Sequence, residues 1–410
     1  MRCKLRKIIC AVLCCGVMAA SCAAQAAGGK VPVLMYHDLT DDAAATNSMT
    51  ITAERFRWDM EFLQQFGYTA LLPADLIDIQ SGAREMPDKP VMITFDDGYR
   101  SNYDYAYPTL QQTGMKAVIS VVAYNMQPSS FASDDRHSLT WDEIYEMANS
   151  GIIEIGSHTY NLHNPQYGGN GAPDGVNGVM RLRGETQSAY NARVGADLTN
   201  ALTMIRQYTG QQTVNYFSYP FGAYDAWMEQ LLNQNGVRVS TLTNGAVADI
   251  SNGLHRLPRY RIMMDNPVSS LLRQSERAAP ALARVSVNGA EASLPAYNIN
   301  GNNYVRVRDV AKLLAGTTSE FSVNWNSEAG RVELISFSAY TPRGNELAPL
   351  PAGSKQVQSV TEPTVADYQA SMVAAFNIDG STFYKLRSLG DLCGFRVDWD
   401  PSSQTVQVTA

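Results

Sequence analysis

"PVMITFDDG", residues 90–98, is a run of apolar residues that ends in two carboxylates and a glycine. A short apolar run closed by a turn signal predicts a buried strand. "VPVLMYH" (31–37) and "IIEIGS" (152–157) have the same form, and the helical pattern "ITAERFRWDMEFLQQFG" (51–67) precedes residue 90. Strands that alternate with helices predict an α/β domain built on a parallel sheet or barrel.

Each predicted strand is followed at once by a polar or conformationally special residue. These residues are His37, Asp96 with Asp97, His158, and Pro220 with Phe221 after "VNYFSY" (214–219). In a β/α barrel the carboxyl ends of the strands form one rim, and that rim holds the active site. We therefore expect these scattered residues to converge in space.

The segment "TFDDG" (94–98) has two readings when it is taken alone. Asp-Gly after a strand is a common turn, and on that reading the carboxylates are structural. Adjacent carboxylates also suit a division of labour, in which one binds a cation and the other acts as a base. The segment by itself leaves both readings open.

The segment "HTYNLH" (158–163) places two of the five histidines of the chain five positions apart. Metal-binding pairs on a helix usually stand four apart, because four steps nearly close a turn. Histidines in a polar loop need no metal. If His158 ends a strand and His163 follows one irregular turn later, two imidazoles and one carboxylate would leave an open position, as a catalytic zinc site requires.

Taken in order with "YFSYPFG" (216–222), these segments resemble the successive motifs of the polysaccharide deacetylase family, carbohydrate esterase family 4 with its nodulation-type deacetylase domain. The resemblance covers roughly residues 30 to 265 and implies a distorted (β/α) barrel domain over residues 30–270. "VPVLMYH" and the five-residue histidine spacing look most similar to the branch that acts on the poly-N-acetylglucosamine of biofilms.

The resemblance implies a role for each residue. A divalent metal ion, zinc or else cobalt or nickel, would be held by Asp97, His158 and His163. Asp96 would be the general base for the water that attacks the acetyl carbonyl. The backbone N–H of Phe221 would help to stabilise the oxyanion. His37 would protonate the leaving amine, and we expect neighbouring Asp96 to keep its imidazole charged.

One position departs from the family pattern. The family often has an arginine two residues before the motif proline, where this chain has Ser218. An arginine of "LHRLPRYRI" (254–262) would substitute, and the candidates are Arg256, Arg259 and Arg261. The histidine of the same stretch, His255, is expected to be structural.

The first 26 residues are predicted to be a signal peptide. A basic start, an apolar run too short to span a bilayer, and the sequence Ala24-Gln25-Ala26 have the layout of an export signal. Cys22 ends "MAASC", which resembles a lipoprotein signal, so soluble secretion and lipidation both stay open. Five of the six cysteines lie in this segment, and Cys393 alone can form no intramolecular disulfide in an exported protein.

Composition excludes other classes of protein. With 45% hydrophobic and 17% charged residues the chain is globular, and a net charge of −7 without a basic stripe argues against nucleic-acid binding. No segment beyond the N-terminal one looks transmembrane. No His-Glu-x-x-His motif of metalloproteases occurs.

The last third of the chain contains an internal repeat. "YNINGNNYVRVRDVAKLL" (297–314) matches "FNIDGSTFYKLRSLGDLC" (376–393), and each copy runs on into a strand. Two copies of a strand–turn–strand–helix–strand unit predict a small α+β domain over residues 284–410. Residues 271–283, which include "SERAAPALA", are expected to be a linker between independent cores.

The repeats resemble the domain named after the N-terminal region of copper amine oxidases, common in exported proteins of Gram-positive bacteria. No histidine follows His255 and Cys393 is a lone thiol, so a copper site lacks its usual ligands. We expect the aromatic side chains of the repeats to be core residues, with sugar-stacking platforms as the alternative. They are Tyr304, Trp325, Phe383 and Trp399.

These observations predict an exported, metal-dependent hydrolase that removes acetyl groups from polymers of N-acetylglucosamine, of the poly-N-acetylglucosamine type. One alternative is a peptidoglycan N-deacetylase, which would share the same site residues. The other is a wall- or carbohydrate-binding protein without activity, although a binder has no need of the base Asp96. The partners would be an N-acetylated polysaccharide and, through the repeats, the cell wall.

Overall fold

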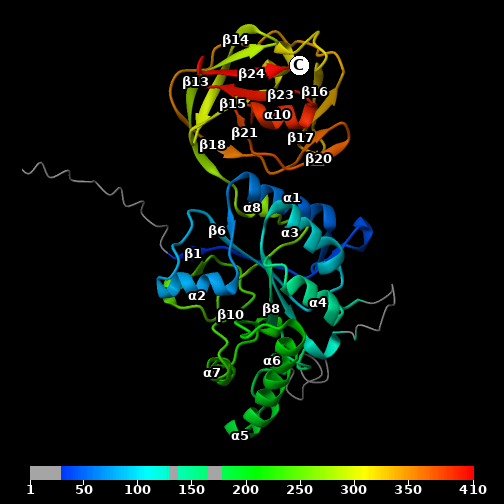
Figure 1. The fold of residues 1–410 in the computed structure, drawn as a ribbon, viewed down its shortest axis with the longest axis vertical. Helices are drawn as coiled ribbons and strands as arrows, with labels where there is room; N and C mark the ends of the chain where they lie inside the picture. The colour runs from blue at the N-terminus through cyan, green and yellow to red at the C-terminus, as the bar shows by residue number, and fades with distance from the viewer. Residues whose placement is uncertain (1–28, 127, 129–136, 164–177) are drawn as a thin grey trace, which may run out of the picture.

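A computed structural model describes residues 29–126, 128, 137–163 and 178–410. The predicted signal peptide and Cys22 lie outside the described residues. The chain forms two bodies, an α/β domain and a β-rich repeat domain (Figure 1).

The α/β domain is built on one parallel sheet in the order β10-β9-β8-β7-β6-β2-β12, with β5 also paired to β6. All of these neighbours run parallel. The strands are β2 (Val33–Tyr36), β5 (Thr69–Ala70), β6 (Pro90–Phe95), β7 (Ala117–Val121), β8 (Ile153–Ser157), β9 (Tyr216–Ser218), β10 (Val239–Thr241) and β12 (Tyr260–Arg261).

The two ends of this sheet approach each other without forming a full ladder. Between β10 and the segment that precedes β12 there is an isolated parallel bridge from Thr241 to Leu257. The predicted distorted (β/α) barrel is therefore confirmed, in an incompletely closed form. Its strands β2, β6 and β8 carry the apolar runs quoted above, and every residue of each is buried.

Helices pack around the sheet. The first of them, α1 (Ala53–Gln65), begins at Thr52, whose hydroxyl accepts a hydrogen bond from the Arg55 N–H. Its buried face contains Phe56, Met60 and Leu63. The others are α2 (Pro73–Ser81), α3 (Tyr107–Thr113), α4 (Trp141–Ala148), α5 (Gln187–Tyr190), α6 (Ala196–Thr209), α7 (Ala226–Gln234) and α8 (Val268–Leu271).

The repeat domain contains both copies of the predicted unit. The first comprises β14 (Ala290–Ile299), β15 (Asn302–Arg306), α9 (Val307–Leu313), β16 (Phe321–Asn326) and β17 (Arg331–Ser336). The second comprises β21 (Ala375–Ile378), β22 (Ser381–Lys385), α10 (Leu386–Cys393), β23 (Arg396–Asp400) and β24 (Thr405–Thr409). Strands β15 and β22 pair antiparallel, so both repeats contribute strands to one sheet, whereas β16 and β17 lie in a second one. The two repeats pack on a common core.

The expected linker is wrong over residues 275–283, because these residues form the first part of the strand β13 (Ser275–Val287). That strand pairs with β14 along most of its length and also with β18 (Lys355–Ser359). Small inward residues such as Ala278 are fully buried there. Pro280 lies where β13 pairs with β14 alone, so its missing N–H is tolerated.

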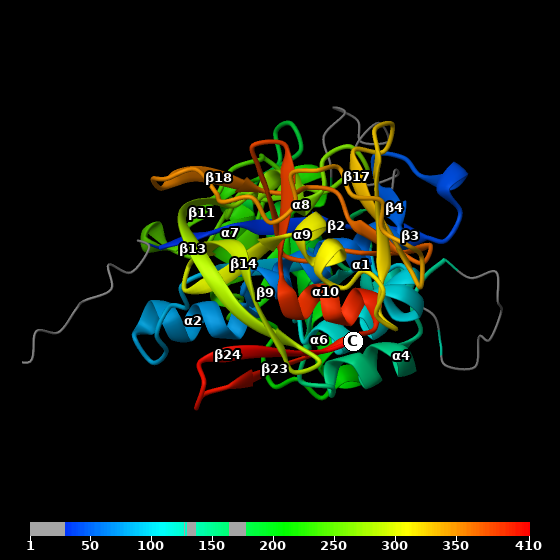
Figure 2. The same ribbon diagram turned by 90° about the horizontal axis from the view of Figure 1, so that it is seen from above.

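The two domains are also in direct contact. Trp58 of α1 donates a hydrogen bond from Nε1 to the Ala370 carbonyl at 3.3 Å, and the Met372 N–H donates to Glu61 at 2.8 Å. The rings of Phe66 and Phe376 meet edge to face, 6.0 Å apart. In the view from above, the repeat domain lies over α1 and α8 (Figure 2).

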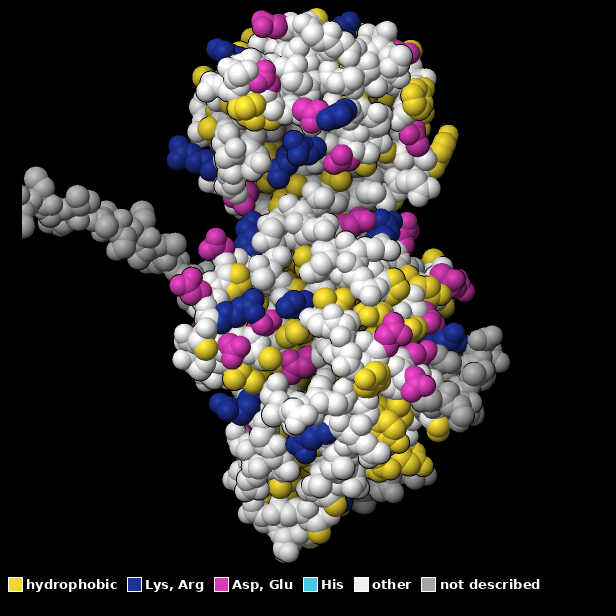
Figure 3. Space-filling view, in the orientation of Figure 1, with side chains coloured by type: hydrophobic (Ala, Val, Ile, Leu, Met, Phe, Trp, Pro, Cys, Tyr) yellow, Lys and Arg dark blue, Asp and Glu magenta, His cyan; other side chains and the backbone are white. Residues whose placement is uncertain are grey.

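The distribution of charged side chains on the surface agrees with the absence of a basic stripe in the sequence. On the face shown in Figure 3, basic and acidic side chains are interspersed over both domains. None of the helices in the described ranges is long and apolar enough to cross a membrane.

Candidate active site and metal centre

Three candidate metal ligands meet at the carboxyl ends of β6 and β8. Asp97 Oδ1 lies 3.4 Å from His158 Nε2 and 3.6 Å from His163 Nε2. One ligand atom from each residue fits within a group spanning 4.8 Å. The residues that follow separate strands in the sequence therefore do converge here.

An irregular turn brings the two histidines together. His158 directly follows β8, and Thr159 adopts a left-handed conformation with φ of 80°. Asp197 of α6 accepts hydrogen bonds from the N–H groups of Tyr160 and Asn161, both at 2.8 Å. The imidazole rings of His158 and His163 end with their centroids 4.8 Å apart. A turn held by Asp197 thus accounts for the five-residue spacing.

The donor set fits a divalent metal ion. Asp97 Oδ1 is buried and has no hydrogen-bond partner among the described residues, although it lies beside two imidazoles. An unpaired buried carboxylate oxygen is costly unless a cation satisfies it. Burial lowers the pKa of His158 to about 4, so its ring is neutral at pH 7, as a metal ligand must be. Two imidazoles and one carboxylate are a common ligand set of catalytic zinc.

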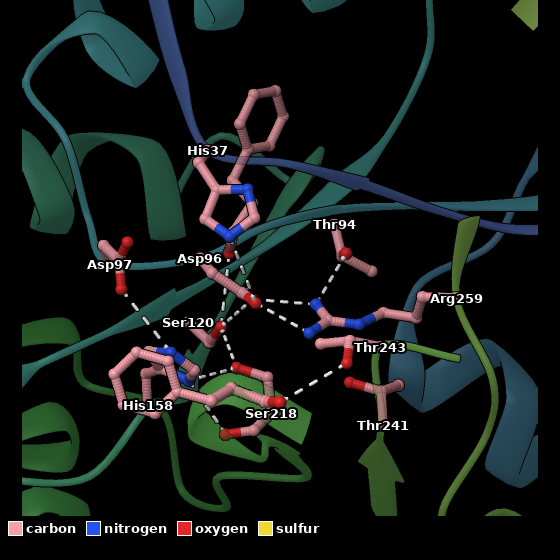
Figure 4. Close-up of polar contacts among 12 residues, drawn as sticks. His37, Thr94, Asp96, Asp97, Ser120, His158, Ser218, Thr241, Thr243 and Arg259 are labelled. Atoms are coloured by element: carbon pink, nitrogen blue, oxygen red, sulfur yellow. Dashed lines mark hydrogen bonds and ion pairs between the residues drawn. The ribbon is translucent and has the colours of Figure 1, made fainter. Parts of the chain in front are cut away.

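Asp96 is fixed by an arginine from the other end of the domain. Arg259 donates from Nη1 to Asp96 Oδ1 at 2.8 Å and from Nη2 to Oδ2 at 2.7 Å (Figure 4). Both side chains are almost fully buried. Burial favours the neutral carboxyl, but the charge of Arg259 outweighs it and holds the pKa of Asp96 well below its usual range. Among the three arginines expected to substitute at Ser218, Arg259 pairs with Asp96.

A chain of buried hydroxyls joins Asp96 to the candidate metal ligand His158. The Ser120 hydroxyl donates to Asp96 Oδ1 at 2.8 Å, and its oxygen lies 2.6 Å from the Ser218 hydroxyl. Ser218 in turn contacts His158 Nδ1 through its hydroxyl at 2.6 Å and its carbonyl oxygen at 2.8 Å. An Nδ1–H that donates to Ser218 leaves Nε2 free for a metal ion.

His37 stands beside the carboxylate at the end of β2. Its Nε2 lies 4.0 Å from Asp96 Oδ2, and the side chain is 8% exposed. Burial lowers the pKa of His37 to about 4, although the charge of Asp96 acts in the opposite direction. The expectation that Asp96 keeps this imidazole charged is therefore wrong for the free protein, because loss of solvent outweighs one carboxylate already paired with Arg259.

Phe221 borders the site from the segment after β9. Its backbone is left-handed with φ of 59°, a conformation uncommon for a residue with a side chain. Its ring stacks on His163 with centroids 4.6 Å apart and remains 61% exposed. An exposed aromatic ring at the rim can contact a bound ligand. His255, expected to be structural, lies elsewhere and pairs with Glu229 at 2.5 Å.

Two supporting residues were missed by the sequence reasoning. Ser120 is the one polar side chain in the middle of "AVISV" (117–121), and a hydroxyl in an otherwise apolar strand was a signal that could have been read. Asp197 sits in an ordinary amphipathic helix, and nothing in its local sequence distinguishes it from a solvated carboxylate.

Comparisons with known proteins agree with this geometry. Residues 83–240 match the polysaccharide deacetylase family, and residues 286–408 match the copper amine oxidase N-terminal domain. YxkH of Bacillus subtilis, which is named as a polysaccharide deacetylase, is 28% identical over 233 residues, 57% of this chain and 71% of that protein.

Two further similar proteins are named as enzymes that remove N-acetyl groups. The poly-beta-1,6-N-acetyl-D-glucosamine N-deacetylase of Escherichia coli is 26% identical over 251 residues, 57% of this chain but only 36% of that protein. The solved structure of a de-N-acetylase from Aggregatibacter actinomycetemcomitans is 25% identical with a TM-score of 0.51, over 59% of this chain and 98% of that one. The chain thus contains a polysaccharide deacetylase domain, of a family that hydrolyses amide bonds in acetylated sugars, followed by a copper amine oxidase N-terminal domain.

Proposed function

We propose that the protein is an exported, metal-dependent deacetylase that hydrolyses the acetamido groups of poly-N-acetylglucosamine. The proposal is supported by the buried Oδ1 of Asp97, which lies between two imidazoles and has no hydrogen-bond partner among the described residues, directly beside an Asp96 that Arg259 keeps ionised. A ligand set next to an oriented carboxylate suits amide hydrolysis. A carbohydrate-binding protein would need neither.

Asp97, His158 and His163 would hold the metal ion, with zinc first and cobalt or nickel as alternatives. When bound, such an ion polarises the acetyl carbonyl and lowers the pKa of a water molecule. Metal identity rests here on the nitrogen and oxygen donors alone, which all three ions accept.

The remaining steps belong to side chains of the protein. Asp96, whose carboxylate is oriented by hydrogen bonds from Arg259 and Ser120, would accept the proton of the attacking water. The Phe221 N–H would donate to the oxyanion that forms on the acetyl oxygen. His37 Nε2, 4.0 Å from Asp96 Oδ2, would pass a proton to the leaving nitrogen as the C–N bond breaks. Because His37 is neutral in the free protein, the proton that Asp96 takes from the water would be passed to His37 before the C–N bond breaks, which returns Asp96 to its ionised form.

The polymer is inferred from relatives. The E. coli protein and a Staphylococcus epidermidis protein, 22% identical over 134 residues, are both named as poly-beta-1,6-N-acetyl-D-glucosamine N-deacetylases. Peptidoglycan is the second candidate, because the same residues would act on it. Export is supported by the N-terminal sequence pattern, with soluble secretion and lipidation at Cys22 both open.

Acetate release from purified protein tests the proposal. Poly-N-acetylglucosamine, chitooligosaccharides and peptidoglycan should be offered in parallel, with Asp96→Asn as the control that keeps the ligand set. We expect the highest kcat/KM on poly-N-acetylglucosamine and a loss on the order of 10²–10⁴ in Asp96→Asn, the usual contribution of a general base. Release from peptidoglycan alone would assign the alternative polymer, and release from none of the three would contradict deacetylation.

A further inference from the structure

A hollow with a cavity volume of about 390 Å³ opens on the repeat domain, where the two repeats meet. The first repeat contributes Arg306 and Arg308 at the start of α9 and Trp325 of β16. The second contributes Asn377 and Thr382 of the β21–β22 hairpin. Ligand sites commonly have volumes of about 300–1,000 Å³. The hollow therefore exists only because the repeats are paired.

Trp325 gives this hollow a flat apolar wall. Its side chain is 51% exposed, so the expectation that it is a core residue is wrong, whereas Tyr304 and Phe383 are buried as expected. Trp325 also lines an adjoining hollow of about 120 Å³, which places the ring between the two spaces. A large exposed ring in a concave site marks a binding surface, and its face can stack on the C–H face of a sugar.

The same hollow is basic. Its lining includes Arg306, Arg308 and Arg343 and no carboxylate, and the adjoining hollow adds Arg273 and Arg331 against the single acid Glu362. Guanidinium groups recognise carboxylate and phosphate through paired hydrogen bonds.

The arginines of the larger hollow are only partly satisfied. Arg306 lies 3.4 Å from Asp309, a fully buried residue that also accepts from the Leu347 N–H. Arg306 also donates from Nη1 to the Asn345 carbonyl at 3.2 Å, and its Nε is buried without a hydrogen-bond partner among the described residues, so only its Nη2 remains to face a ligand. Arg308 donates to the Val323 carbonyl at 3.3 Å and also contacts the Tyr340 hydroxyl. Donor capacity therefore remains for an anion.

The second repeat provides an internal comparison. Trp399 occupies the position equivalent to Trp325 and is 55% exposed, so its predicted place in the core is also wrong. Asn324, next to Trp325, is replaced there by Asp398, which Arg396 binds at 2.6 Å. The second tryptophan therefore has a carboxylate beside it, and an anionic ligand would be disfavoured at that position.

We propose that the hollow formed by Trp325, Arg306, Arg308 and Arg343 binds an anionic saccharide, a sugar unit that carries a carboxylate or a phosphate within a glycan. The tryptophan stacks on the ring and the arginines bind the anion. This site does not rest on the proposed function. It disfavours the cationic amino sugars that a deacetylase produces, so the repeat domain holds a polymer other than the product.

Calorimetry with the full chain tests this assignment. The probes are oligogalacturonate, whose charge is carboxylate, a glucosylated poly(glycerol phosphate), whose charge is phosphate, and neutral chitohexaose. We expect at least one anionic probe to bind, and the one that binds identifies the source of the charge. Added salt should weaken binding, because charge pairs are screened. Trp325→Ala and Arg343→Gln should each weaken it by about tenfold or more.

Trp399→Ala is the matched control, since it removes an equally exposed tryptophan at the equivalent position, and it should leave binding unchanged. Arg343 is exposed, so Arg343→Gln should fold normally, and unchanged thermal unfolding of each variant checks this. The proposal is overturned if neither anionic probe binds, if chitohexaose binds as tightly as they do, or if Trp399→Ala weakens binding as much as Trp325→Ala.

Discussion

Arg259 binds both carboxylate oxygens of Asp96 across a sequence separation of 163 residues. The pair is buried, so removing the arginine would leave an uncompensated charge in the core of the domain. Arg259 is thus one of the three arginines that the sequence offered as a partner for Asp96, and the one that pairs with it. Its geometry is bidentate, which a lysine cannot reproduce.

Arg259→Lys should keep the charge and lose the orientation of Asp96. We expect a fall of about 10²-fold in kcat/KM, the usual effect of a misplaced group, with metal content unchanged. Arg256→Lys, at a solvent-exposed position of the same segment, is the control and should be nearly normal. Full activity of Arg259→Lys would show that charge alone is needed.

Metal removal should abolish acetate release, and zinc, cobalt or nickel should restore it. Asp97→Ala and His163→Ala should each lower the metal content of purified protein, because each removes one of three ligand side chains. Elemental analysis measures this directly. His255→Ala removes a histidine outside the group and should retain the metal. Undiminished metal in both ligand variants would contradict the site.

His37→Ala should separate proton delivery from the other steps. An amide needs a proton on its leaving nitrogen, whereas an activated aryl acetate ester does not. We expect a large loss of kcat/KM on amide substrates and a much smaller one on the ester, with metal content unchanged. Equal losses on both substrates would assign a structural role to His37.

Asp59 should make the stability of the domain depend on pH. Tyr36 and the Val268 N–H donate hydrogen bonds to it, and burial raises its pKa to about 7. The folded state therefore binds a proton that the unfolded state releases between about pH 4 and 7, and stability falls as pH rises through that window. Asp59→Asn should remove this loss, on the order of a few kcal/mol, in urea unfolding at pH 5 and pH 8.

The control for that experiment is Asp391→Asn, which changes an exposed carboxylate of α10 and should keep the wild-type dependence. If the wild-type protein had the same free energy of unfolding at pH 8 and at pH 5, ionisation of Asp59 would not destabilise the folded state, and the prediction would be wrong.

Truncation should show that the domains are not independent. Ending the chain after Gln274 removes β13 and exposes Trp58 and Phe66, whose partners Ala370 and Phe376 are lost. We expect a lower melting temperature for the truncated domain than for the full chain, measured by circular dichroism. Identical melting of the deacetylase domain in both chains would restore the view that a linker separates two cores.

Much of the site could be predicted because it lies at strand ends. An apolar run predicts a strand, and the residue after it reaches the rim, which placed Asp96, Asp97 and His158 correctly. The turn that carries His163 followed from the need to bring two imidazoles together. These are local patterns, and because the strands are parallel their carboxyl ends meet at one rim.

What could not be predicted depends on contacts between distant segments. "SERAAPALA" has a single large apolar residue, Leu282, and contains Pro280. Its local pattern therefore predicts a linker, and only the pairing with β14 and β18 makes it a strand. The charge state of His37 depends on how deeply it is buried, which a sequence does not give. Trp325 and Trp399 alternate like core residues but face outward.

The position of Arg259 near the end of its domain also affects how the protein matures. A chain is synthesised from its N-terminus, and domains fold as units while they emerge. Asp96, its strand β6 and the neighbours β2 and β7 all exist well before residue 259 is made. Until then the carboxylate lacks its guanidinium partner, and burying it ionised would cost several kcal/mol. We therefore expect the hydrolytic site to be completed last, when the whole domain has been produced.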